Sequence, residues 1–188
     1  MSSTTVVSLP QTGVWGIDPI HSTVTFSVAH HVIARFRAGF GPVSGAYDAD
    51  AGKLFGEVEA TNVILAPLPP LQALKEHLLG PGFFDAEHFP TLSFSAADLQ
   101  LDGQSLTANG ELTMHGVTLP IVAVGAVRGP QNVTNPQGVS DRIGIDLQTV
   151  IDRRQWGVDF NNEVAAGVIN LGWDVTIDAA LELVVARG

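Results

Sequence analysis

The last part of the chain, residues 171–184, is one long stretch in which apolar and polar residues alternate. Apolar side chains occupy every second position from Trp173 to Leu183, and mostly acidic residues and threonine lie between them. Successive side chains of a β-strand point to opposite faces, so this spacing builds one apolar wall and one polar wall. A typical strand has only about 5–6 residues. So long a strand favours a tall antiparallel barrel or a deep sandwich.

Shorter stretches of the same kind recur through the chain, at residues 23–28, 54–61, 91–96, 106–114 and 143–148. Turn-forming pairs such as Asp102-Gly103 and His115-Gly116 separate them. Strands with this regular punctuation are typical of a meander of hairpins that closes on itself. The sequence therefore predicts an all-β fold, an elongated antiparallel β-barrel.

One segment has helical spacing instead. Leu71, Leu74 and Leu78 follow Pro69-Pro70, and Gly80-Pro81 ends the pattern. This spacing predicts a short helix that bridges two strands or covers one end of the barrel. A second irregular stretch, residues 153–166, is expected to contain a helical turn, so the barrel should carry one or two short helices.

The composition favours a single domain over residues 1–188, with residues 1–12 as a flexible segment. Hydrophobic residues make up 45% of the 188 residues and charged residues only 15%, which supports a large core. The net charge of −10 argues against binding to nucleic acid and to anionic membrane surfaces. The absence of cysteine excludes disulfides and thiolate chemistry.

The N-terminal residues MSSTTVVSLPQTG have neither the basic region nor the apolar core of a secretory signal. The chain also has no run of about 18 apolar residues that would insert stably into a membrane. We therefore expect a cytoplasmic location.

Catalytic and metal-binding patterns are weak. The six histidines lack the spacing of a metal site, and His30 and His31, adjacent on a strand, would face opposite sides. His77 could approach residues 85–88, where Asp85, Glu87 and His88 lie, but histidines satisfied by the backbone are far commoner. No G-x-S-x-G nucleophile motif occurs. We expect no catalytic residue, no metal and no cofactor.

Small residues recur at inward positions. Such residues indicate either close approach of two backbones or space left for a ligand, and the sequence does not decide between these. They are Gly56, Ala60, Ala96, Ala108, Gly110, Ala123 and Gly125.

Two adjacent arginines, Arg153 and Arg154, precede Trp156 in a chain that is poor in cations. At the mouth of a cavity they would meet an anionic or polar head group. Pairing with the abundant carboxylates is the commoner role for such arginines.

Several segments together resemble the YceI-like family of lipocalin-like barrels, in the right order over nearly the whole chain. They are WGIDPIHSTVTFSVAH (15–30), FFDAEHFPTLSFS (83–95), GELTMHGVTLPI (110–121) and RRQWGVDFN (153–161). The resemblance implies an elongated barrel around a hydrophobic pocket that takes polyprenyl, quinone-like or fatty chains. It also implies a possible homodimer and no established catalytic residues.

We therefore expect a non-catalytic carrier or store of a long isoprenoid or other lipid chain. The alternatives are a solidly packed barrel that serves as a protein-interaction module and, less favoured, an enzyme with His30 or His115 as general base. The predicted ligand-binding residues are Val24, Phe26, Val28, Leu92, Phe94, Leu112, Met114, Trp173, Val175 and Ile177. The predicted polar residues at the cavity mouth are His30, Arg153, Arg154 and Trp156.

Overall fold

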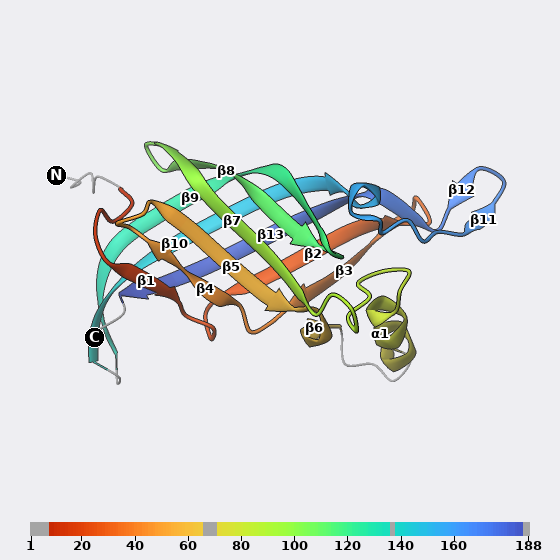
Figure 1. Cartoon of the computed structure of the whole chain (residues 1–188), viewed down its shortest axis with the longest axis horizontal. Helices are drawn as coiled ribbons and strands as arrows, with labels where there is room; N and C mark the ends of the chain where they lie inside the picture. Colours follow the sequence, from red (N-terminus) through yellow and green to blue (C-terminus); the bar gives the residue numbers. More distant parts are fainter. Residues whose placement is uncertain (1–7, 66–70, 136–137, 186–188) are drawn as a thin grey trace.

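The computed structural model describes residues 8–65, 71–135 and 138–185, most of which lie in β-strands. Its elongated barrel has β1 and the end of β13 at one end, and α1 with the β11–β12 hairpin at the other (Figure 1). The strands are β1 (Val14–Ile17), β2 (Thr23–His30), β3 (Ala34–Phe40), β4 (Ser44–Asp48), β5 (Lys53–Glu59), β6 (Val63–Ile64), β7 (Thr91–Asp102), β8 (Ser105–Met114), β9 (Val117–Asn135), β10 (Gly138–Asp152), β11 (Glu163–Ala165), β12 (Val168–Ile169) and β13 (Leu171–Val185). The helical elements are η1 (Ala60–Asn62), α1 (Leu71–Leu79) and η2 (Arg153–Trp156).

Eight antiparallel strands close the barrel in the order β1-β4-β5-β7-β8-β9-β10-β13, with β13 pairing back to β1. This closure confirms the predicted fold class. β13 holds the ring together because its edges bind three strands: β10 along one edge, and β2 and then β1 along the other. Strands β3 and β6 extend the sheet beyond β2 at the end that carries α1.

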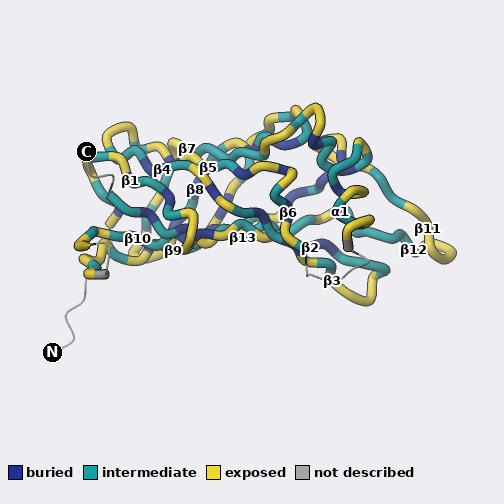
Figure 2. Tube along the Cα trace, turned by 90° about the horizontal axis from the view of Figure 1, so that it is seen from below, coloured by how far each residue is buried: buried dark blue, intermediate teal, exposed yellow. Residues whose placement is uncertain are grey.

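The half of the barrel near β1 is packed solid. Ile143 and Ile145 of β10 lie opposite Leu183 and Leu181 of β13, and all four side chains are buried. Figure 2 shows short buried stretches interspersed with less buried ones along the strands of this half. Apolar burial here supplies the main driving force for folding. The other buried side chains of this half include Trp15, Tyr47, Leu54, Leu106 and Val127.

Small residues serve both of the purposes that the sequence left open. A Cβ atom added to Gly110 would collide with the backbone oxygen of Ser95, and one added to Gly125 would collide with that of Asp146. These two glycines therefore permit close approach of neighbouring strands. Ala123, in contrast, lines an internal cavity.

The helical predictions are confirmed in outline. α1 begins at Leu71, after Pro69-Pro70, which lie outside the described residues, and it ends just before Gly80. The irregular segment contains the turn η2. In the expected flexible segment, residues 1–7 also lie outside the described residues, whereas Leu9 is buried in the core.

Candidate ligand cavity

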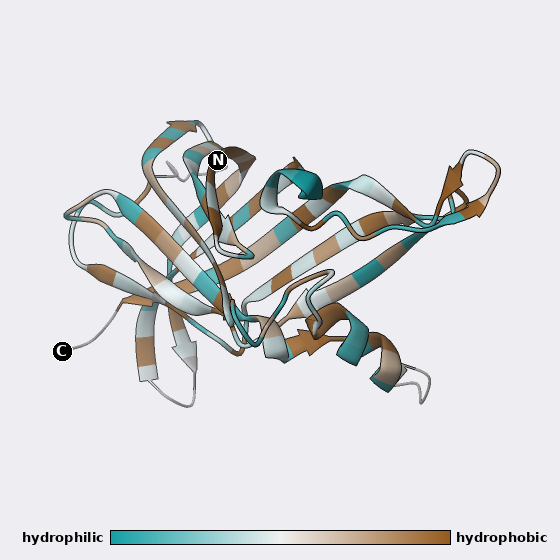
Figure 3. Ribbon diagram, turned by 45° about the vertical axis from the view of Figure 1, so that its right-hand side comes forward, coloured by the Kyte–Doolittle hydropathy of each residue, from teal (hydrophilic) through white to brown (hydrophobic). Residues whose placement is uncertain are grey.

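An internal cavity of about 290 Å³ occupies the half of the barrel that carries α1. Its walls come from β2, β3, β5, β7, β8, β9, β10 and β13, and α1 and the loop after it contribute Leu74, Leu78, Phe83 and Phe84. Figure 3 shows hydrophobic residues along these strands and on α1. The lining is predominantly apolar, which is typical of small-molecule sites.

Four phenylalanines form one side of this cavity. The rings of Phe26 and Phe40 lie 5.5 Å apart, and Phe84 contacts both at 6.0 and 5.4 Å, edge to face. Phe36 lies 6.1 Å from Phe26. Such pairs pack favourably and rigidly, so this wall is preformed.

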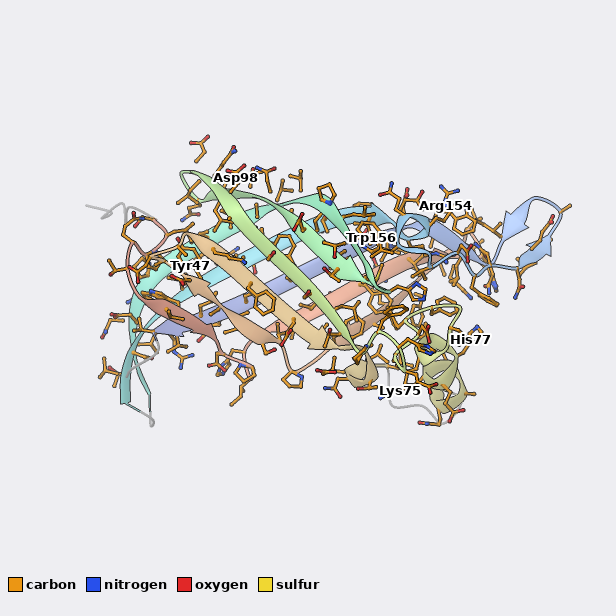
Figure 4. All side chains as sticks on the ribbon, in the orientation of Figure 1. Tyr47, Lys75, His77, Asp98, Arg154 and Trp156 are labelled. Atoms are coloured by element: carbon orange, nitrogen blue, oxygen red, sulfur yellow. The ribbon has the colours of Figure 1, made fainter. Side chains whose placement is uncertain are left out.

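The mouth of the cavity, defined here by His77, Phe83 and Phe160, lies where α1 meets the segment after η2. The His77 ring packs edge-to-face against both phenylalanines, with 5.0 Å between ring centres in each case. His77, which comes from α1 (Figure 4), lines the cavity and is also exposed to solvent. Because His77 is exposed, the cavity reaches the protein surface beside these three rings.

The structure brings the predicted ligand-binding residues together around one space, with one exception. The members of the set that line the cavity are Val24, Phe26, Val28, Leu92, Phe94, Leu112, Met114, Val175 and Ile177. His30 and Arg153, predicted at the mouth, also line it. The rings of His30 and His31 are stacked 3.8 Å apart, so the expectation that they face opposite sides was wrong. The reason is that His31 lies in a turn with φ of 52°, beyond the end of β2.

Trp173 lies outside the cavity wall, although its position in the alternation pointed inward. The register of β13 against β2 shifts between Leu171 and Val175, and this irregularity displaces the side chains between them. The Trp173 ring packs instead against Arg153 and Arg154, with its centre 4.7 and 4.8 Å from the two guanidinium carbons.

Arg154 and Trp156 also lie outside the wall. Arg154 is half exposed and donates hydrogen bonds to Asp152, which lower the pKa of that carboxyl. Trp156 is fully buried, and its indole N–H donates to the carbonyl of Leu112 at 3.1 Å. This bond ties η2 to β8; Trp156 is labelled in Figure 4.

Arg153 is buried and fixes the segment after η2. Its Nε donates to the carbonyl of Gly172 at 3.0 Å, and its Nη1 donates to those of Val158 and Phe160 at 2.7 and 3.0 Å. Burial lowers the pKa of this guanidinium, although nearby aspartates act in the opposite direction. An arginine nevertheless stays protonated in a protein.

The sequence reasoning missed part of the wall. Phe36 and Phe40 alternate on β3 in the same way as the residues used for β2, so the alternation could have identified them. Phe83, Phe84 and Phe160 lie on loops, where no periodicity shows which way a side chain points.

Among the described residues, His77 does not form a metal-binding group with Asp85 and His88. His88 pairs with Asp85, which raises the pKa of His88 through a hydrogen bond, whereas His77 packs on phenylalanines. The described residues form one group with metal-binding geometry, Asp18, His21 and Glu182, and none of these three lines the cavity. Arg142 donates to both carboxylates of this group, which makes it an ion-pair network.

No helix in the described ranges combines the length and the apolarity that crossing a membrane requires.

Comparison with known proteins identifies relatives over most of the chain. The model of the YceI-like domain matches residues 15–183. A UPF0312 protein of Staphylococcus aureus is 26% identical over 175 residues, covering 90% of this chain and 96% of the relative.

Two solved structures share the fold. Burkholderia cenocepacia BcnA aligns with a TM-score of 0.70 at 17% identity, over 88% of this chain and 98% of that protein. A polyisoprenoid binding domain from Saccharophagus degradans aligns with a TM-score of 0.68 at 14% identity, over 92% and 98%. At these identities the likeness shows the fold.

Proposed function

We propose that this chain, which belongs to the YceI-like domain family, binds a long apolar chain in its cavity and carries or stores it unchanged. The observation that carries the proposal is the preformed apolar cavity in one half of a barrel whose other half is packed solid. The name of the Saccharophagus domain supports an isoprenoid as the ligand. The proposed contacts are Val24, Phe26, Val28, Leu92, Phe94, Leu112, Met114, Val175 and Ile177.

The size of the cavity limits how much of the ligand is held. Small-molecule sites span roughly 300–1,000 Å³, so about 290 Å³ is at the lower end. At about 30 Å³ per water-sized group, the cavity takes roughly ten methylene-sized groups. We therefore expect a short apolar segment inside, with the rest of a longer chain leaving through the mouth.

Burial of ten methylenes gains roughly 8 kcal/mol. Lost translation and rotation cost about 4 kcal/mol or more. The balance of about −4 kcal/mol corresponds to millimolar binding. Tighter binding therefore requires contacts beyond the apolar wall.

Filling the cavity with a larger side chain should weaken ligand binding. Ala179 lines the cavity and Ala180, its neighbour on β13, is exposed, so the two form a matched pair. We expect Ala179→Phe to lose at least tenfold in affinity for farnesol, measured by titration calorimetry, while Ala180→Phe binds like the parent. Equal farnesol binding by a folded Ala179→Phe variant and the parent would mean that the ligand binds elsewhere.

We also propose that the chain is a single domain over residues 1–188, lies in the cytoplasm, forms a homodimer and carries out no catalytic step. Light scattering after gel filtration measures the oligomeric state, and cell fractionation measures the location. Recovery of bound farnesol with its mass unchanged tests the absence of chemistry. A new product mass would instead support the enzyme alternative.

A further inference from the structure

The wall of the apolar cavity contains two polar side chains that each have a buried atom without a hydrogen-bond partner. Arg153 is only 4% exposed, and its Nη2 has no partner. The Oδ1 atom of Asn170 is buried and also lacks a partner. Both residues line the cavity. Buried polar atoms without partners are rare and costly, so their presence in a cavity wall needs a cause.

The surroundings of Arg153 leave its positive charge without an ionic partner. Its Nε and Nη1 donate to neutral backbone carbonyls of Gly172, Val158 and Phe160. Asp152, next to it in the chain, is bonded to Arg154. Within the described ranges, the ion pairs of the chain do not include Arg153.

We infer that Arg153, assisted by Asn170, receives the carboxylate head group of a long-chain monocarboxylic acid whose apolar chain fills the cavity. This inference rests on the proposed function and names the class of ligand. The free N–H groups of Nη2 would donate to one carboxylate oxygen. In the same wall, the amide N–H groups of Asn170 would donate to the carboxylate, whereas its Oδ1, which is an acceptor, would not contact it.

A head group with a single negative charge fits better than the alternatives. One buried guanidinium balances one carboxylate, whereas a phosphate of nearly two charges would remain partly unbalanced in a protein whose net charge is −10. A ligand with a hydrocarbon end would leave Nη2 of Arg153 without a hydrogen-bond partner. A hydrogen bond between charged partners is about twice as strong as a neutral one, so the carboxylate also gains more than an alcohol.

The first test varies the ligand and keeps the protein unchanged. Dodecanoate, dodecan-1-ol and methyl dodecanoate share one chain length and differ only in the head group. We expect calorimetry at pH 8 to show dodecanoate binding at least about tenfold more tightly than the alcohol or the ester. Equal affinities would overturn the head-group inference and leave the proposed function intact. No binding of any of the three would overturn both.

The second test varies the two adjacent arginines. Arg153→Met retains an unbranched side chain and removes the charge, whereas Arg154→Met is a control because Arg154 lies outside the cavity wall. We expect the preference for dodecanoate over dodecan-1-ol to disappear in Arg153→Met and to persist in Arg154→Met. A preference that survives in a folded Arg153→Met variant would contradict the inference.

Arg153 also supports the fold through three backbone carbonyls, so circular dichroism must first show that its variant is folded. If it is not, Asn170→Leu replaces it, because the buried Oδ1 of Asn170 has no hydrogen-bond partner within the described residues. We expect Asn170→Leu to reduce the dodecanoate preference several-fold without weakening the binding of methyl dodecanoate. An unchanged preference in that variant would remove Asn170 from the site.

Discussion

Asp18 illustrates how motif residues of this chain serve the fold and not the cavity. Its carboxylate accepts hydrogen bonds from His21, from the backbone N–H of Ile20 and from Arg142, each at 2.9 Å. The His21 contact contributes most to holding the pKa of Asp18 well below its usual range, against the opposing effect of burial. Arg142 of β10 also forms an ion pair with Glu182 of β13. The cluster therefore links the loop between β1 and β2 to strands β10 and β13.

The lowered pKa of Asp18 makes stability depend on pH. A carboxyl with a folded pKa below its unfolded value, about 3.9, contributes stability above that value and loses it as the pH falls through the folded pKa. We expect Asp18→Asn to cost about 2 kcal/mol in urea unfolding at pH 7 and less at pH 3. Asp102→Asn, at the exposed last residue of β7, is the control. An Asp18→Asn penalty that does not shrink at acid pH would contradict this role.

At Gly125, too, a single residue matters for stability. A methyl group added there would collide with the backbone of Asp146. We expect Gly125→Ala to destabilise the protein by about 1–3 kcal/mol through overpacking. Gly144→Ala is the matched control, since its Cβ would lie 3.9 Å from the nearest atom, the Cβ of Arg128. Similar midpoints of thermal unfolding for the two variants would refute the argument from close approach.

Among the elements, β13 shows what alternation can and cannot predict. Val175 and Ile177 face the cavity as expected, because regular pairing preserves the period of two. Trp173 does not, because the register shift between Leu171 and Val175 interrupts that period. A bulge depends on the partner strand and leaves no mark in the alternation of its own strand.

The loops after α1 and after η2 also contain cavity residues that no sequence pattern predicted. The helix was predictable from its leucine spacing, but Phe83, Phe84 and Phe160 reach the cavity through loop geometry. The loop after α1 is fixed by backbone bonds, such as that from Phe84 N–H to the carbonyl of Leu78 at 3.0 Å. The position of these aromatic rings in the cavity wall therefore had no signal in the sequence.

If the aromatic mouth retains the ligand, opening it should speed release. We expect Phe160→Ala to raise the dissociation rate of farnesol about tenfold, equivalent to about 1.4 kcal/mol, in a stopped-flow displacement experiment. Phe55→Ala, on the exposed face of β5, is the control. An unchanged dissociation rate in Phe160→Ala would show that the ligand leaves by another route.

At the scale of the whole molecule, the barrel divides its interior between stability and binding. Close-packed residues such as Ile145 and Leu183 fill one half, and the other half encloses the cavity. The alternation predicted an apolar interior along the full length, and it could not tell which half is hollow. That distinction depends on side-chain volumes from opposite walls, which meet only in the folded barrel.

The central claim is that the hollow half holds an apolar chain, and native mass spectrometry of the purified protein tests it most directly. We expect a bound mass that survives native conditions, is released on denaturation and is identified by extraction as an aliphatic or isoprenoid chain. A protein that carries no added mass, and gains none after incubation with farnesol and dodecanoate, would contradict the account.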